Sequence, residues 1–124
     1  MANIFDALRR EKQSIDIPAV VVIGLGRFGF SLACELMDHG VEVLGIDTSE
    51  KFVRDYSPIL TEVVQADTTD AEVLRQLGVA EVERVVLAIG SHLEDSILTA
   101  SNLVELGIKD IWAKADSDAH ARIL

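Results

Sequence analysis

The chain of 124 residues is about one domain long, and its 21 acidic and 11 basic residues give a formal net charge of −10. Hydrophobic residues make up 49% and charged residues 26%, which is a globular composition and excludes a wholly disordered chain. A surface this acidic repels phosphate backbones and anionic lipids, so nucleic acid is excluded as an expected partner. No apolar run approaches the roughly 20 residues of a spanning helix. With no signal-peptide pattern and one cysteine, Cys34, we expect a cytosolic domain without an internal disulfide.

The first 18 residues differ from the rest of the chain. Ile4, Phe5 and Leu8 recur at helical spacing, and Pro18 closes the segment. This pattern predicts an amphipathic N-terminal extension over residues 1–18, followed by the main domain over residues 19–124.

Strand and helix patterns alternate from residue 19 onward. Glycines end several predicted helices, and two Ser/Thr-x-x-Glu capping boxes, Thr69 with Glu72 and Ser91 with Glu94, begin two of them. Strands are predicted at residues 19–24, 41–46, 61–65, 84–89 and 110–114, and helices at 27–39, 49–56, 69–78, 91–106 and 117–124.

This alternation predicts an α/β fold of the Rossmann-like doubly wound kind, in which helices cover both faces of a parallel sheet. The expected strand order for the five visible strands is 3-2-1-4-5. A complete fold of this kind has a sixth strand, which the sequence lacks. We therefore expect the chain to be part of a longer protein, with the sixth strand missing by truncation.

The segment Gly24-Leu25-Gly26-Arg27-Phe28-Gly29 is the strongest functional motif, because it joins a β-branched strand to an amphipathic helix. Gly24 would permit the tight turn, Gly26 would let the backbone approach a pyrophosphate, and Gly29 would let the helix pack closely. The free N–H groups of the helix then favour an anionic ligand. The alternative is a purely structural turn between strand and helix.

Asp47 ends the second predicted strand at about the 20-residue spacing at which an acidic residue binds a ribose hydroxyl. Its charge would repel a 2′-phosphate, which favours NAD or ATP over NADP. The alternative role is to cap the next helix through Thr48 and Ser49.

Two further strand ends are expected at the same crevice, because ligands of open parallel sheets bind at the carboxyl ends of strands. Asp67 and Thr68 would lie at the adenine edge, although the neighbouring Thr69, Asp70 and Glu72 are equally typical of helix capping. The flat surface under the ribose and phosphates would be formed by Ala88, Ile89 and Gly90.

Two cations are candidates for phosphate contacts. Arg27 could clamp a terminal phosphate with its guanidinium, or could be an ordinary solvated arginine. Lys114 at the end of the fifth strand could reach a polyphosphate, or could simply end the strand. No histidine has the partners of a proton shuttle, and no cluster has metal-ligand spacing, so binding without turnover is expected.

Taken together, the motifs resemble the RCK domain, also called KTN or TrkA-N. The matching segments span nearly all of residues 19–124: GLGRFG at 24–29, GID at 45–47, QADTTD at 65–70, VVLAIG at 85–90 and IWAKADSDAH at 111–120. The family's dimer crossover and C-terminal regulatory lobe are absent here, and residues 1–18 match nothing in the family core.

The resemblance implies a cytoplasmic regulatory subunit of a Ktr or Trk potassium uptake system, peripheral to the inner face of the membrane through its transporter partner. It implies ATP, ADP or NAD(H) as a non-catalytic ligand, and we place ATP/ADP ahead because Arg27 suits a terminal phosphate. The implied site is Gly24, Gly26, Arg27, Phe28, Gly29, Asp47, Thr48, Asp67, Thr68, Ala88, Ile89, Gly90 and Lys114.

Two alternative functions stay open at this point: a truncated NAD-dependent oxidoreductase, and the RCK domain of a potassium efflux antiporter. Whichever holds, we expect a homodimer or larger ring, because the predicted helices at 93–106 and 117–124 are apolar on more than one side. The residues that carry this expectation are Leu98, Leu103, Val104, Leu106, Ile123 and Leu124.

Overall fold

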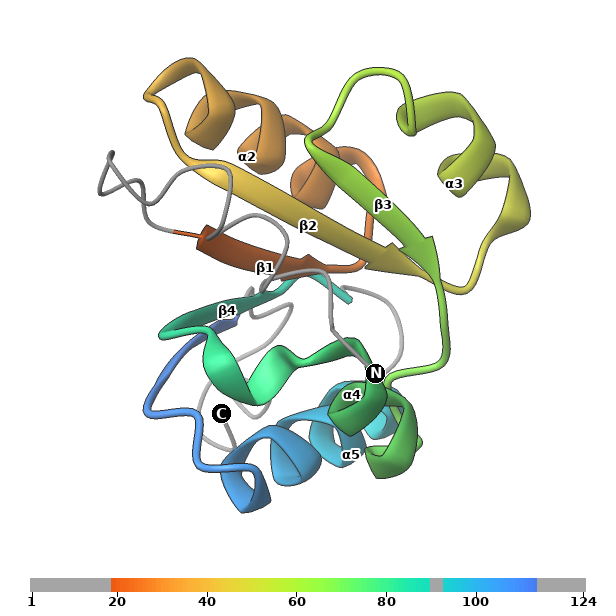
Figure 1. Ribbon diagram of the computed structural model, residues 1–124. Helices are drawn as coiled ribbons and strands as arrows, with labels where there is room; N and C mark the ends of the chain where they lie inside the picture. The colour runs from red at the N-terminus through yellow and green to blue at the C-terminus, as the bar shows by residue number, and fades with distance from the viewer. Residues whose placement is uncertain (1–18, 90–92, 114–124) are drawn as a thin grey trace.

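The structure, a computed structural model, describes residues 19–89 and 93–113. These residues form a parallel sheet in the order β3-β2-β1-β4-β5 with helices on both faces (Figure 1), so the predicted Rossmann-like fold and strand order are confirmed. The strands are β1 (Ala19–Ile23), β2 (Glu42–Asp47), β3 (Glu62–Gln65), β4 (Arg84–Leu87) and β5 (Asp110–Ala113). The helices are α2 (Arg27–Asp38), α3 (Glu50–Tyr56), α4 (Ala71–Leu77) and α5 (Leu93–Glu105), with a 3₁₀ turn η1 (Val79–Glu81).

The sheet is buried on both sides, which explains why its central strand is a continuous apolar run. Alternate residues of β1 face opposite layers: Val21 packs in a core with α4 and α5, and Val20 and Val22 pack in a core with α2. Figure 1 shows α2 and α3 on one side of the sheet and α4 and α5 on the other. None of the described helices is long and apolar enough to cross a membrane.

The register brings the carboxyl ends of neighbouring strands to one edge. Ile23 at the end of β1 is aligned with Ile46 in β2 and with Leu87 in β4. Asp47 at the end of β2 is aligned with Gln65 in β3. The loops that follow β1, β2, β3 and β4 therefore begin side by side.

One predicted helix start was wrong. Asp70, not Thr69, is the N-cap of α4, and its carboxylate accepts a hydrogen bond from the N–H of Glu72 at 3.0 Å. The Thr69 hydroxyl does not cap the helix, because it donates a hydrogen bond to Asp67 Oδ1 at 2.6 Å. The other predicted capping box, Ser91 with Glu94, includes Ser91, which lies outside the described residues.

The apolar residues at 98–106 lie on more than one side, as the sequence predicts. Leu98 and Val104 are 46% and 65% exposed, as an extra apolar face requires. Leu103 is fully buried and Leu106 packs against the core, so these two residues belong to the buried side. The predicted strand end at Lys114, Gly90, the 1–18 extension and the helix at 117–124 lie outside the described residues.

Candidate nucleotide-binding site

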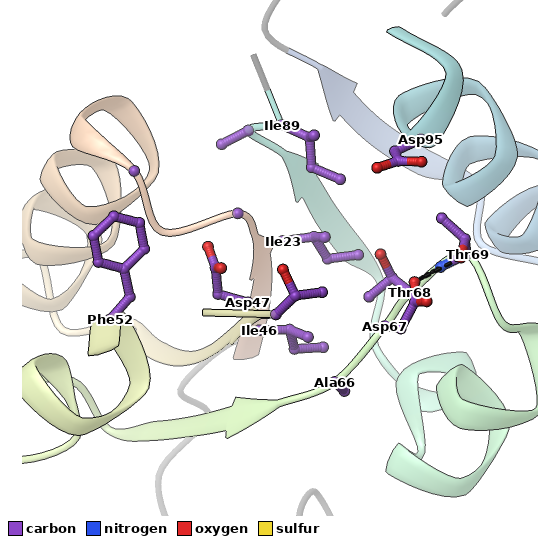
Figure 2. Close-up of a pocket in the computed structure, with 14 residues that line it drawn as sticks. Ile23, Ile46, Asp47, Phe52, Ala66, Asp67, Thr68, Thr69, Ile89 and Asp95 are labelled. Carbon is purple, nitrogen blue, oxygen red and sulfur yellow. Dashed lines mark hydrogen bonds between the residues drawn. The ribbon is translucent and has the colours of Figure 1, made fainter. Parts of the chain in front are cut away.

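A cavity of about 290 Å³ opens at the carboxyl edge of the sheet (Figure 2). Residues from the ends of β1, β2, β3 and β4 line it, together with one side chain each from α3 and α5. The lining residues are Ile23, Gly24, Gly26, Ile46, Asp47, Thr48, Phe52, Ala66, Asp67, Thr68, Thr69, Ala88, Ile89 and Asp95.

Gly24 makes the turn that leaves β1. Its φ of 97° lies in the left-handed region that favours glycine. Its N–H donates to the Ile46 carbonyl at 2.7 Å, and a Cβ at this position would lie 2.9 Å from the carbonyl carbon and oxygen of Ala88. The turn is therefore packed between the ends of β2 and β4, and only glycine fits.

Gly29 and Gly26 play opposite steric roles in the same loop. A Cβ on Gly29 would lie 1.8 Å from the Gly24 carbonyl oxygen, so its absence lets the first turn of α2 pack against the loop. A Cβ on Gly26 would have no atom within 4 Å, and Gly26 lines the cavity. The backbone at Gly26 thus borders open space, as close approach of a ligand requires.

Asp47 links the glycine loop to the end of β2 through a hydrogen bond. Its Oδ2 accepts the N–H of Leu25 at 2.6 Å, and its Oδ1 accepts the N–H of Ser49 at 2.8 Å. Each carboxylate oxygen has a second lone pair, so the group keeps acceptor capacity toward the cavity. The N-cap of α3 is Ser49 itself, whose hydroxyl accepts the N–H of Phe52 at 3.2 Å, so Asp47 supports the N-cap residue and does not cap the helix. Asp47 also lines the cavity.

Asp67 is held at the end of β3 by its neighbour. Its Oδ1 accepts the hydroxyl of Thr69 at 2.6 Å and the N–H of Thr69 at 3.0 Å. The hydroxyl contact, followed by the backbone contact, lowers the pKa of the Asp67 carboxyl below its ordinary value, so the group is ionised at neutral pH.

Thr68 lines the cavity, but its hydroxyl is used inside the protein. Its Oγ1 lies 3.0 Å from the Oγ1 of Thr99 on α5, and both side chains are buried. Asn102, one turn further along α5, donates from Nδ2 to the carbonyls of Thr68 at 3.2 Å and Thr69 at 2.9 Å. Side chains of helix α5 are therefore hydrogen-bonded to the segment that follows β3.

The charge of the cavity is negative. Its titratable lining residues are three aspartates, Asp47, Asp67 and Asp95, and no lysine, arginine or histidine lines it within the described ranges. Arg27 and Phe28 are exposed at the start of α2, outside the lining set. No group of three or more possible metal-ligating side chains occurs among the residues that the structure describes.

Of the predicted site residues, Gly24, Gly26, Asp47, Thr48, Asp67, Thr68, Ala88 and Ile89 lie together around the cavity, whereas Gly90 and Lys114 lie outside the described residues. The sequence analysis missed Phe52 and Asp95, which line the cavity from α3 and α5. The sequence did contain a signal for them, because α3 and α5 begin soon after β2 and β4, and the carboxyl ends of these strands border the cavity.

The fold and this edge define a Rossmann-like domain with a glycine turn at the end of β1. The family model of the TrkA-N domain matches residues 20–124, and the chain belongs to this family. That finding confirms the resemblance inferred from the motifs.

Two of the curated relatives come from Bacillus subtilis (strain 168). Ktr system potassium uptake protein C is 44% identical over 103 residues, which is 83% of this chain and 47% of that protein. Ktr system potassium uptake protein A is 43% identical over 103 residues, 83% of this chain and 46% of that protein. The chain thus spans a little under half the length of these relatives.

Two solved structures share the fold. The GsuK channel bound to NAD gives a TM-score of 0.76 at 17% identity, with 89% of this chain and 20% of that chain covered. The AMP-bound form of Shewanella denitrificans Kef CTD gives a TM-score of 0.70 at 23% identity, with 83% of this chain and 62% of that chain covered.

Proposed function

We propose that the chain is a nucleotide-sensing regulatory domain of a potassium uptake system, which binds an adenine nucleotide without turning it over. Its relatives are subunits of Ktr potassium uptake systems. Neighbours in fold are solved with NAD and with AMP. The proposed domain is residues 19–124, with residues 1–18 as an N-terminal extension.

The observation that carries the proposal is the pairing of open space at Gly26 with the Asp47 carboxylate in one cavity. Phosphates would approach the backbone at Gly26 and the N-terminus of α2, where unpaired N–H groups and the helix dipole attract anions. The ribose hydroxyls would donate to Asp47, and the base would lie toward Asp67 and Thr68. This order places each part of the nucleotide against a group of suitable chemistry.

Other residues would complete the site. The side chain of Arg27 makes no hydrogen bond or ion pair with the residues that the structure describes, so its guanidinium is available for a terminal phosphate. Thr48, Ala88 and Ile89 would border the sugar, with Phe28, Gly90 and Lys114 as further candidates. Because Arg27 suits a terminal phosphate, we place ATP and ADP ahead of NAD(H).

The proposed partner is a membrane-embedded potassium transporter subunit, which would hold the domain at the cytoplasmic face of the membrane. Nucleotide binding can alter such a partner only through contacts that differ between two states of the assembly. We propose a non-catalytic role, because the relatives are potassium uptake proteins of Ktr systems.

Calorimetric titration with ATP, ADP, NADH and NADPH tests the proposed function. We expect ATP, ADP and NADH to bind, and NADPH to bind at least about tenfold more weakly because Asp47 repels its 2′-phosphate. Absence of binding by all four nucleotides would overturn the proposal, and NADPH binding as tight as NADH would remove the role of Asp47. Steady NADH oxidation with carbonyl substrates would favour an oxidoreductase instead.

The exposed apolar residues of α5 predict self-association. Val104→Glu should raise the dissociation constant of the dimer by about tenfold or more, because it places a charge on an apolar contact surface. Light scattering over a range of protein concentrations measures the effect. Ser31→Glu, at an exposed position on α2, is the control and should leave association unchanged. A wild-type chain that stays monomeric with and without ATP would contradict the prediction.

A further inference from the structure

The cavity has two distinct ends. Figure 2 shows Asp95 and Thr69 at one end, with Asp67 and Thr68 nearby, whereas Asp47 and Phe52 lie toward the other. A nucleotide carries its base and its phosphates on opposite sides of the ribose. With phosphates at the glycine turn and ribose at Asp47, the base therefore lies at the end that Asp95 borders.

Apolar side chains form part of the wall of this cavity. Ile23 and Ile46 form buried ends of β1 and β2, and Ile89 and Ala66 contribute half-buried side chains after β4 and β3. Such walls can hold the flat face of any base, so discrimination between bases must come from polar groups at its edge.

The two hydroxyl groups at this end are already engaged, and Asp67 is tied through its Oδ1 to Thr69, although its Oδ2 keeps acceptor capacity. The Thr68 hydroxyl pairs with Thr99, and the Thr69 hydroxyl donates to Asp67. Asp95 differs, because its exposed side chain makes no hydrogen bond or ion pair with the residues that the structure describes. Its carboxylate is thus an available acceptor in the cavity.

An ionised carboxylate only accepts hydrogen bonds. Adenine presents a donor at its 6-amino group, whereas hypoxanthine and guanine present a 6-oxo acceptor. A carboxylate held opposite position 6 would face a donor on adenine but a second acceptor on a 6-oxopurine, whose nearest donor is the N1–H, so the mismatch at position 6 disfavours the 6-oxopurine.

We propose that Asp95 is a specificity-determining residue, whose carboxylate accepts a hydrogen bond from the 6-amino group of adenine and so selects adenine over 6-oxopurine nucleotides. This inference rests on the proposed function. Asp95 also lies in the first turn of α5, where an acidic side chain stabilises the helix whatever the ligand. The experiment must separate these two roles.

The test compares the dissociation constants of AMP and IMP, which differ at position 6 of the base. The wild-type chain should prefer AMP, and Asp95→Asn should lower the IMP-to-AMP ratio of dissociation constants by about tenfold, because an asparagine amide can turn its NH₂ toward a 6-oxo group. Glu94→Gln is the matched control: it removes the same charge from the same turn, and Glu94 does not line the cavity.

The outcomes are distinguishable. A lowered ratio in Asp95→Asn with an unchanged ratio in Glu94→Gln supports the proposal. An unchanged ratio in Asp95→Asn, with AMP still bound, overturns the role of Asp95 but leaves the proposed function standing. A wild-type chain that binds neither AMP nor IMP also overturns the role of Asp95, whereas the proposed function is decided separately by the titration with ATP, ADP and NADH. Thermal unfolding of each variant reports the helix-stabilising role separately from base selection.

Discussion

Gly29→Ala is expected to destabilise the domain by roughly 3 kcal/mol or more, enough to unfold a marginally stable domain. The new Cβ would lie 1.8 Å from the Gly24 carbonyl oxygen and 2.9 Å from its carbonyl carbon, both backbone atoms of the same loop. Backbone atoms cannot rotate away as a side chain can, so α2 or the glycine turn would have to move. Urea unfolding followed by circular dichroism measures the loss.

Gly26→Ala is the control for this variant, because it adds the same methyl group to the same loop. The φ of Gly26 is −67°, which alanine adopts readily, and no atom lies within 4 Å of the added Cβ. We expect this variant to stay folded but to bind nucleotide at least about tenfold more weakly, since the methyl occupies the space that a pyrophosphate needs. A Gly29→Ala chain as stable as Gly26→Ala would contradict the steric argument.

The sheet and its order could be predicted from sequence because the signals are local and repeated. The run at residues 19–23 is apolar throughout, and the glycine motif follows it directly. The helices that follow alternate with further β-branched runs, and chain connectivity in parallel folds leaves few topologies. These features need no knowledge of distant contacts.

The sequence analysis fell short where distant or competing contacts decide the outcome. Thr69 and Asp70 are both good caps, and the choice between them depends on Thr69 donating its hydroxyl to Asp67. Leu103 and Val104 are adjacent apolar residues of α5, and only the rotation of the helix against the sheet buries the first and exposes the second. Sequence spacing alone cannot fix that rotation.

Asp47 shows that a residue can have a structural role that neither interpretation of its sequence position predicts. The sequence offers ribose binding and helix capping as alternatives. In the structure the carboxylate accepts the N–H of Ser49, accepts the N–H of Leu25 across the glycine loop, and still borders the cavity. The protein bonds would hold the carboxylate in place for a ligand, which is how binding groups are commonly positioned.

Asp47→Ala is therefore expected to act on both stability and binding. Loss of the two backbone contacts should lower the free energy of unfolding by about 1–3 kcal/mol, and loss of the ribose acceptor should weaken ATP, ADP and NADH by about tenfold to a hundredfold. Asp47→Asn keeps one acceptor oxygen and should fall between alanine and wild type in both measurements. Urea unfolding and calorimetric titration on the same preparations give the two quantities.

The control for charge is Asp38→Ala, which removes an exposed aspartate at the far end of α2 from the cavity. It changes the net charge equally, so a general electrostatic effect on an anionic ligand would appear in both variants. If Asp47→Ala lowers stability but binds nucleotides as tightly as Asp38→Ala, the carboxylate serves only the loop. If its affinity falls selectively, the same two hydrogen bonds that fasten the glycine turn also hold the acceptor that the ribose needs.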